Sequence, residues 1–485
     1  MTDTRSFLQP FAQWIAARGL AGVYVVGGCL RDELAGRAAS TQVRNIDIAV
    51  PREALRLTEA FARVVHGAFV LLDADAGSAR AVWSVGETRV ELDVSDFRAP
   101  TLAADLTLRD FTVNAMAAPL DAYVRGEPLA RILIDPLHGC DDLRAHRLRA
   151  VFDRTFLEDG ARLLRGVSLA ARLDFTIDEP TRALMRRSAA AIDGVAGERT
   201  CETLFQLLAS PRAAWGLAEL DALAILERIL PELVVCRGVS QGGHHHLDVW
   251  AHSLETVRQF EALLADPPWP EPLHALLVAY LRDAPAGDRP RAALLKWAGL
   301  CHDLGKPAQR RVDETGRVWF TGHERVGAEL VEAIGQRLKL SVREIRTVCA
   351  IVMAHLRPGD LTRMTALTRR AVFRFFRDLG EDGPGVLLVW LADRAATRGP
   401  ASDETHLGAQ QAIVIQLLEH YFLKPEEAVR LPRLIDGHAL MRALGVPPGP
   451  LVGEWLRRIE EAQADGQVRT ADEAIALARQ WHRAE

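Results

Sequence analysis

Two polar residues separated by a single residue, Asn45 and Asp47, lie in the segment VRNIDIAV, whose apolar residues alternate as in a β-strand. Side chains two residues apart on a strand share a face, so both could reach one ligand. Two carboxylates in this arrangement could hold two divalent metal ions for in-line phosphoryl transfer. One of the two residues is an amide here. A later strand, RVELDVSDFR, offers Asp93 as another carboxylate, although Asp93 could equally be a solvent-exposed residue of an edge strand.

Two further segments could handle a phosphate. GGCLRD follows a strand and opens a helix, and its glycines would let backbone N–H groups approach an anion, although Gly-Gly turns are common without one. LRDFTVNAMA offers an arginine that can pair with a triphosphate, unless its aspartate simply caps an ordinary helix. The candidate nucleotide-binding residues of the two segments are Gly27, Gly28, Arg31, Asp32, Arg109, Asp110 and Asn114.

A second group of ionisable residues recurs in or beside apolar helical stretches of the middle of the chain. Burying such groups costs free energy unless they bind each other or a metal ion. A lone histidine on an apolar helix face is more often a satisfied core residue, but that explanation fits a whole series poorly. The residues are His252, His302, Asp303, His323, His355 and Asp393, whereas His244, His245 and His246 are expected to be exposed loop residues.

The length and composition of the chain limit the number of domains and the class of protein to which these candidate residues belong. The 485 residues predict three or four domains, and 49% hydrophobic and 25% charged residues are ordinary for a soluble protein. No apolar run approaches the roughly 20 residues of a membrane span. Six cysteines without a CxxC pair favour a cytoplasmic protein. A net charge of −5 is unusual for a dedicated nucleic-acid binder, so any RNA contact must come from local arginine clusters.

The periodicity predicts an α/β domain over 1–145, with strands at 23–26, 46–50, 68–72, 80–85 and 88–94. From about Asp153 onward the pattern is helical. A Gly- and His-rich link near residue 240 and a break near residue 400 divide this part further. We therefore expect helical domains over 146–235, 236–400 and 401–485.

The combination of N-terminal motifs resembles the class II tRNA nucleotidyltransferases and the related bacterial poly(A) polymerases. The likeness continues through IDPLHGCDDL and FLEDGARLLRGVSLAARL. It implies a polymerase-β-like mixed sheet, Mg²⁺ at Asp47 and Asp93, and tRNA, CTP and ATP as partners. It also implies that Asp159 and Arg162 read the incoming base; placed three apart on one helix they would share a face, unless they are a surface ion pair. Monomer and homodimer both remain open.

The stretch CHDLGKP and the order of the central residues resemble the HD metal-dependent phosphohydrolases. By that resemblance His252, His302, Asp303 and Asp393 would hold one metal ion, and His323 and His355 a second. Imidazole and carboxylate ligands suit Mn, Fe, Co, Ni or Zn better than Mg. Some bacterial tRNA nucleotidyltransferases carry such a domain after the neck. The final segment also resembles their C-terminal element, with Arg457 and Arg458 suited to the tRNA backbone, unless it is a plain helical hairpin.

The chain departs from the family pattern at four positions: Asn45, Leu108, Gly160 and Ser168. Asn45 removes one negative charge, which predicts weaker metal binding and a large loss of transfer rate. The leading hypothesis is a transferase that adds or repairs all or part of the 3′ CCA of tRNA, with an attached phosphohydrolase. The alternative is a phosphohydrolase whose N-terminal domain only binds RNA, and a third reading is a non-catalytic RNA-binding protein.

Overall fold

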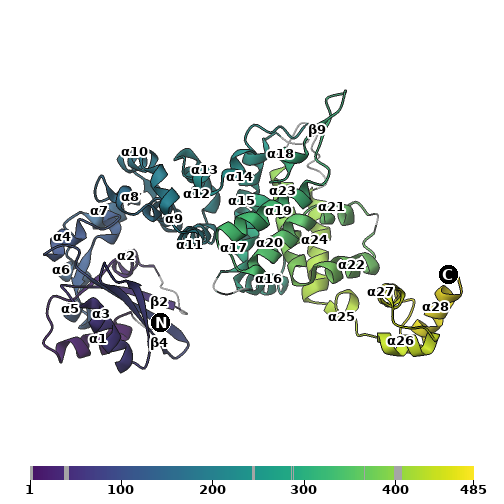
Figure 1. Ribbon diagram of the computed structural model, residues 1–485, viewed down its shortest axis with the longest axis horizontal. Coiled ribbons are helices and arrows are strands. Elements are labelled where there is room, and N and C mark those ends of the chain that lie inside the picture. Colours follow the sequence, from purple (N-terminus) through teal and green to yellow (C-terminus); the bar gives the residue numbers. More distant parts are fainter. Residues whose placement is uncertain are drawn as a thin grey trace. The chain divides into compact units, whose positions relative to one another are not determined.

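The computed structural model describes residues 4–37, 43–242, 246–285, 287, 289–364, 366–397 and 407–484 (Figure 1). The chain divides into two compact units. The first comprises Met1–Val195 with Ala222–Ile225, and the second comprises Ala196–Asp221 with Leu226–Glu485. None of the described helices is both long and apolar enough to cross a membrane.

The first unit is built on a six-stranded sheet in the order β3-β4-β5-β2-β1-β6. Strands β2 and β5 are parallel, and the other neighbours are antiparallel. The predicted mixed α/β fold is thereby confirmed, and since β5 lies inside the sheet, Asp93 is not on an edge strand. The strands are β1 (Tyr24–Val26), β2 (Val43–Val50), β3 (Ala68–Asp73), β4 (Ser78–Val85), β5 (Thr88–Asp96) and β6 (Ala117–Pro119).

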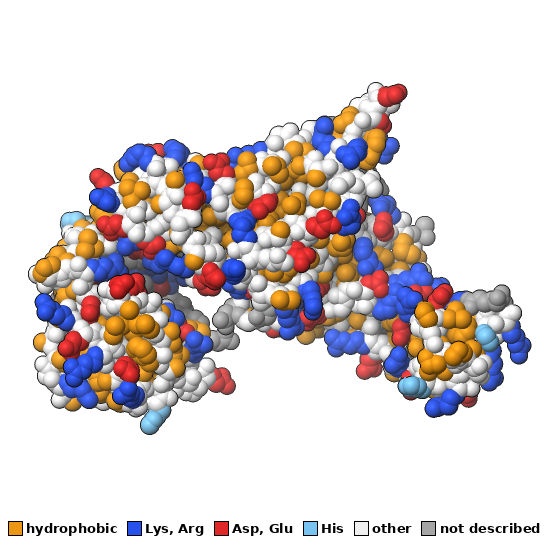
Figure 2. Space-filling view, viewed as in Figure 1, with side chains coloured by type: hydrophobic (Ala, Val, Ile, Leu, Met, Phe, Trp, Pro, Cys, Tyr) orange, Lys and Arg blue, Asp and Glu red, His pale blue; other side chains and the backbone are white. Residues whose placement is uncertain are grey.

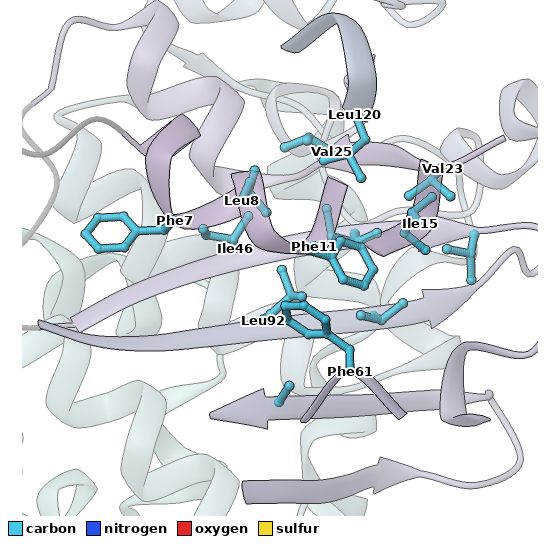
Figure 3. Close-up of a cluster of buried hydrophobic side chains, with 14 of the residues drawn as sticks. Phe7, Leu8, Phe11, Ile15, Val23, Val25, Ile46, Phe61, Leu92 and Leu120 are labelled. Carbon is cyan, nitrogen blue, oxygen red and sulfur yellow. The ribbon is translucent and has the colours of Figure 1, made fainter. Parts of the chain in front are cut away.

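One face of this sheet packs against helices. Ile46 of β2 and Leu92 of β5 belong to the core, together with Phe11 of α1 and Phe61 of α3 (Figure 3). Burying each such side chain contributes about 1.5–3 kcal/mol, so the core fixes which sheet face stays free. Because strand residues alternate between faces, the neighbours of Ile46 and Leu92 point away from the core. The helices involved are α1 (Thr4–Ala16), α3 (Ala54–Val64) and α5 (Leu120–Val124).

The remainder of the first unit is mainly helical, as predicted, with a small parallel pair of β7 (Arg147–Leu148) and β8 (Thr176–Ile177). Two-residue strands are too short to show alternation in a sequence. The helices are α2 (Gly28–Leu34), α4 (Leu102–Leu106), η1 (Thr112–Asn114), α6 (Leu129–Ile132), α7 (Gly139–Arg144), α8 (Thr155–Glu158), α9 (Ala161–Leu173), α10 (Glu179–Arg187) and η2 (Ala189–Gly194).

The second unit is helical apart from the hairpin of β9 (Arg311–Val312) and β10 (Val318–Trp319). Its C-terminal part has a core of its own around Leu440 and Trp455. The helices are α11 (Gly197–Leu208), α12 (Ala213–Ala222), α13 (Leu226–Ile229), α14 (Pro231–Val234), α15 (Val249–Ala265), α16 (Leu273–Arg282), α17 (Arg291–Cys301), α18 (Lys306–Gln309), α19 (His323–Arg337), α20 (Val342–Ala354), α21 (Arg357–Thr362), α22 (Arg369–Leu379), η3 (Gly380–Asp382), α23 (Gly383–Ala396), α24 (Leu407–Phe422), α25 (Pro425–Ala428), α26 (Gly437–Leu444), α27 (Pro450–Ala464) and α28 (Ala471–Ala484).

Candidate functional site

The parallel pairing of β2 and β5 creates a polar face on the sheet, opposite the core. In this register Asp47 lies beside Asp93, and Asn45 lies beside Glu91. All four side chains occupy alternating positions between core residues, so they share the polar face. The sequence reading identified three of these residues and missed Glu91, which precedes Asp93 by two positions on the same strand.

Arg80 of β4 binds two acidic residues of β5, Glu91 and Asp93. Its Nε and Nη2 donate to the two Asp93 oxygens at 2.6 and 2.8 Å, and its Nη1 donates to Glu91 at 2.5 Å. Arg89 lies 2.8 Å from the other Glu91 oxygen. A guanidinium that donates two hydrogen bonds to one carboxylate fixes the orientation of that carboxylate. No sequence motif indicated Arg80, because its role depends on the pairing of β4 with β5.

The pKa of Asp47 on the polar face is perturbed. Burial, and then the negative charge of Asp93, raise the pKa of its carboxyl to about 6, whereas Arg109 and Arg165 act in the opposite direction. Crowded carboxylates repel each other, and a cation between them relieves that repulsion. Hard carboxylate oxygens also suit Mg²⁺. The donor set therefore fits the expected magnesium ion, which Asp47 and Asp93 would hold.

The Gly-Gly turn packs directly against Asp47. Gly27 has φ +76°, and a Cβ there would lie 2.7 Å from an Asp47 carboxylate oxygen. The backbone N–H of Gly28 donates to Asp47. Both glycines thus position the acid as well as opening the turn. The following helix α2 buries Arg31, whose guanidinium donates to Asp32 at 2.9 Å and to Asn114 at 2.6 Å.

The segment around Asp110 is tied to α9. Asp110 accepts hydrogen bonds from Asn114 at 3.1 Å and from Arg165 at 3.0 Å. Although burial alone would raise it, the charge of Arg165 holds the pKa of Asp110 below its usual value. Arg109 lies 3.2 Å from Asp105, on the helix before it. Arg165, three residues after Arg162 in the same motif, was missed by the sequence reading although its helical spacing could have revealed it.

The sequence predicted that Asp159 and Arg162 lie on one continuous helix, and this prediction is wrong. Asp159 has an extended backbone between α8 and α9, and only Arg162 lies in the first turn of α9. The next residue, Gly160, packs tightly, because a Cβ there would lie 2.0 Å from the Ala191 carbonyl oxygen. Arg162 is 8% exposed and donates to the Thr155 and Leu108 carbonyls, each at 3.3 Å. The two residues remain neighbours, since the Arg162 N–H donates to the Asp159 carbonyl.

The motif IDPLHGCDDL braces this region. Asp142 is fully buried and receives hydrogen bonds from Arg147 at 2.7 Å, Arg149 at 2.8 Å and Thr112 at 2.7 Å. It therefore anchors η1, which carries Asn114. The motif acts through packing and hydrogen bonding on the candidate nucleotide-binding residues.

The second unit brings six predicted residues together in a histidine centre, formed by His252, His302, Asp303, His323, His355 and Asp393. They come from α15, the end of α17, the start of α19, the end of α20, and α23. His252 Nε2 lies 2.9 Å from Asp393, and His302 Nε2 lies 3.1 Å from Asp303. His323 Nε2 lies 3.3 Å from the other Asp303 oxygen. Five of the six are less than 9% exposed.

The donor atoms form two groups of three that share Asp303. One comprises His252, His302 and Asp303, and the other Asp303, His323 and His355; within each, the donor atoms lie within 4.8 Å of one another. One Asp303 oxygen is buried without a hydrogen-bond partner. A buried carboxylate oxygen among imidazoles is the environment that a divalent metal ion satisfies. The residues present therefore fit a metal ion.

Backbone carbonyls orient three of the imidazoles. The Nδ1 atoms of His302, His323 and His355 lie 2.8, 2.8 and 2.6 Å from the carbonyls of residues 299, 320 and 352. Donation from Nδ1 leaves Nε2 as the metal-binding atom, which is the usual outer support of a histidine ligand. Burial, and then the charge of His302, lower the pKa of His355 to about 3, so its imidazole is neutral and able to coordinate.

Lys306 and Gln241 complete this environment and were not predicted as site residues. Lys306 Nζ lies 2.6 Å from Asp303 Oδ2 and 2.6 Å from the Gln241 side-chain oxygen, and Gln241 comes from the Gly- and His-rich link. Of the three adjacent histidines, His246 is exposed, as expected, whereas His244 and His245 lie outside the described residues.

Four family models match this chain. Residues 23–149 match the poly A polymerase head domain, and residues 249–397 match the HD domain. Residues 174–236 match a model described as "Probable RNA and SrmB-binding site of polymerase A". Residues 427–478 match tRNA nucleotidyltransferase domain 2.

Characterised relatives match over nearly the whole length. An A-adding tRNA nucleotidyltransferase of Deinococcus radiodurans is 37% identical over 95% of both chains. A CC-adding tRNA nucleotidyltransferase of Thermus thermophilus is 34% identical over 94% of this chain and 93% of its own. A CCA-adding enzyme of Thermotoga maritima complexed with tRNA has a TM-score of 0.62 at 19% identity, over 100% of this chain and 97% of that one. A CCA-adding enzyme with ATP has a TM-score of 0.64 at 18% identity, over 100% and 96%.

Proposed function

Because this chain belongs to the tRNA nucleotidyltransferase family, we propose that it completes or repairs the 3′ CCA end of tRNA, or part of it, from CTP and ATP. The observation that carries the proposal is the polar face, where Asp47 and Asp93 lie side by side next to the Gly27–Gly28 turn. Full-length likeness to an A-adding and a CC-adding enzyme supports it. The alternative of an N-terminal domain that only binds RNA is not favoured.

In the proposed reaction the tRNA 3′ hydroxyl attacks the α-phosphate of the nucleotide, and pyrophosphate leaves. A magnesium ion bound by Asp47 and Asp93 would supply charge neutralisation of the phosphates. Arg109 and Arg165, close enough to Asp47 to lower its pKa, would stabilise the triphosphate. Asp159 and Arg162 would select the base by hydrogen bonds to its edge. Gly27, Gly28, Arg31, Asp32, Asp110 and Asn114 would hold the nucleotide or these side chains in place.

We propose partial addition, either of A or of CC, because two relatives above 30% identity along nearly the whole chain are named for A addition and CC addition. The test offers labelled ATP to tRNA ending in CC, and labelled CTP to tRNA lacking all three nucleotides. Incorporation in one pairing alone identifies the reaction. Incorporation in both would indicate complete CCA addition, and none in either would contradict the transferase proposal.

The histidine centre supports a second proposed activity, hydrolysis of a phosphoester. One divalent ion of Mn, Fe, Co, Ni or Zn would be held by His252, His302, Asp303 and Asp393, and a second by His323 and His355. Such an ion would supply a nucleophilic hydroxide. We propose a phosphomonoester or phosphodiester of RNA ends as substrate, for example a 2′,3′-cyclic phosphate. The test is hydrolysis of the cyclic phosphate to a terminal phosphomonoester by protein loaded with each metal in turn. Protein that binds the metal but opens no phosphoester would contradict this activity.

We further propose four functional regions, 1–145, 146–235, 236–400 and 401–485, and the family matches run close to these divisions. Arg457 and Arg458 of the last region are proposed contacts with the tRNA backbone. Free thiols at all six cysteines support a proposed cytoplasmic location. A monomer or a homodimer is proposed, and sedimentation would distinguish the two.

A further inference from the structure

The hairpin of β9 and β10 connects two elements of the histidine centre. It follows α18, which begins at Lys306, and it precedes α19, which begins at His323. Figure 1 shows the hairpin, labelled at β9, projecting beyond the helices around it. Because two short strands bury little surface, the hairpin adds little to the core, and its outward side chains can meet a ligand.

One face of the hairpin combines an exposed indole with two arginines. Trp319 pairs with Arg311 across the two strands, and cross-strand partners point to the same face. Arg317 precedes Trp319 by two positions, and its carbonyl accepts from the Asp313 N–H, so the pairing continues and Arg317 shares this face. Trp319 is 39% exposed, and both arginines are exposed. Figure 2 shows basic and apolar side chains together on this projection.

The opposite side of the hairpin lies beside the histidine centre. A Cβ on Gly242 would lie 3.7 Å from Val318, so this side approaches the Gly- and His-rich link. The Lys306 ammonium lies 5.4 Å from the centre of the Phe320 ring and also donates to a carboxylate of the histidine centre. The Phe320 carbonyl lies 2.8 Å from the imidazole of His323 and orients it. Trp319 therefore directly precedes a residue that contacts the centre.

We propose that Arg311, Arg317 and Trp319, together called the hairpin arm, bind the single-stranded RNA whose terminal phosphoester the histidine centre hydrolyses. A base stacks on the Trp319 indole, and the two guanidinium groups pair with neighbouring phosphates. This inference rests on the proposed phosphoester hydrolysis. It specifies that the substrate is a strand of several nucleotides and not a free nucleotide.

Charge supports RNA as the occupant of the hairpin arm. The chain has a net charge of −5, so an RNA contact requires a local group of arginines, and the arm supplies one beside an aromatic ring. Asp313 lies in the adjoining turn, where its carboxylate accepts from the Thr315 hydroxyl and from the N–H of Arg317. The carboxylate is thus engaged in closing the turn.

An exposed apolar side chain without a function is the competing explanation, because soluble proteins commonly have such residues singly. It predicts that substitutions in the hairpin arm leave the hydrolysis of every substrate unchanged. The hairpin arm instead predicts a loss that depends on the length of the RNA, since a free nucleotide has no further base or phosphate to reach the arm.

The experiment compares two substrates on the full, metal-loaded chain. One is an oligoribonucleotide that ends in a 2′,3′-cyclic phosphate, and the other is the corresponding nucleoside 2′,3′-cyclic phosphate; each consumes one water and yields a phosphomonoester. Trp319→Ala is expected to raise KM for the oligoribonucleotide about tenfold, as loss of one stacked base does, with kcat unchanged. Both constants for the nucleoside substrate should stay the same, and Trp319→Phe should recover most of the affinity.

Two further variants separate the hairpin arm from the folding of the hairpin. Arg311→Ala combined with Arg317→Ala should raise the same KM and weaken its dependence on salt, because two phosphate contacts are lost. Val312→Ala, on the opposite face of the same hairpin and 48% exposed in the unsubstituted chain, is the matched control and should behave like that chain.

Equal changes for the two substrates, or arm variants that match Val312→Ala, would overturn the hairpin arm. Hydrolysis by the unsubstituted chain would in that case still support the proposed function. If the unsubstituted chain hydrolysed neither cyclic phosphate, the proposed hydrolysis would be contradicted, and the hairpin arm with it.

Discussion

At the scale of single residues, the position of Asp47 depends on the glycine that packs against it. Gly27 combines a positive φ with a close approach to Asp47, and only glycine accepts both. The sequence suggested that this glycine serves the phosphate through its backbone. The structure adds that it leaves room for a carboxylate.

Gly27→Ala is expected to lower nucleotide incorporation by an order of magnitude or more, because the new methyl group displaces Asp47. The backbone strain itself costs about 1–3 kcal/mol, because few residues other than glycine adopt φ +76° with ψ −143°. Gly36→Ala is the matched control, since Gly36 has φ +63° and nothing within 4 Å of a Cβ. Equal losses of activity in the two variants would mean that strain alone, and not the contact with Asp47, is responsible.

Asp303 is the single acid shared by both donor groups of the histidine centre. Asp303→Asn is therefore expected to remove most of the bound transition metal, whereas His355→Gln, which touches one group only, should leave part of it. Metal content after gel filtration, measured by mass spectrometry, checks this. Retention of the full metal content by Asp303→Asn would show that the ion is bound elsewhere.

At the scale of elements, an ionic contact joins α22 to α27. Arg370, Arg374 and Arg377 all donate to Glu461, whose side chain is about one-tenth exposed. Figure 2 shows basic side chains gathered where these two helices meet. Hydrogen bonds from Arg374, and then from the other two arginines, lower the pKa of Glu461 to about 2. These ion pairs hold the C-terminal helix α27 against α22, in addition to the separate hydrophobic core of the C-terminal helices.

Glu461→Gln is expected to lower the free energy of unfolding near neutral pH by about 1–3 kcal/mol, the usual worth of charged hydrogen bonds. Since the folded pKa is depressed, this stabilisation is present above the ordinary value of 4.5 and disappears as the pH falls toward 2. Thermal unfolding from pH 7 to pH 2.5 would show the two curves converge in acid. Glu454→Gln, on the exposed side of α27, is the control and should match the unsubstituted chain throughout.

At the scale of the whole molecule, the two candidate metal sites differ in chemistry and belong to different units. The polar face offers carboxylate oxygens, which suit Mg²⁺, whereas the histidine centre offers mainly imidazole nitrogens, which suit transition metals. The two proposed activities should therefore be separable by metal alone.

Protein stripped by a chelator is expected to regain nucleotide incorporation with Mg²⁺ and to regain phosphoester hydrolysis only with a transition metal. Assaying both activities on one preparation, with Mg²⁺ and then with added Mn²⁺ or Ni²⁺, checks this. Hydrolysis restored by Mg²⁺ alone would indicate that the histidine centre does not select metals by ligand type.

The sequence by itself predicted five of the six strands of the sheet, without β6, together with the helical character of the remainder and the residue types that could bind metals. These follow from local properties, namely the period of apolar residues and the chemistry of individual side chains. The family motifs likewise identified Asp47, Asp93 and the histidine centre. Short strands such as β7 and β9, and the extended residue Asp159 between α8 and α9, were not predicted because their signals span only a few residues.

Only the tertiary structure decided which of these residues meet. The placement of Glu91 beside Asn45 depends on pairing strands that are more than 40 positions apart, and the grip of Arg80 on Asp93 depends on a third strand. The contact of Arg165 with Asp110 spans 55 positions. Such partners are chosen by packing of the core and by sheet register, which no local pattern encodes. The effect of the amide at position 45 on the candidate site therefore depends on the residues of the neighbouring strands, and not on the segment VRNIDIAV alone.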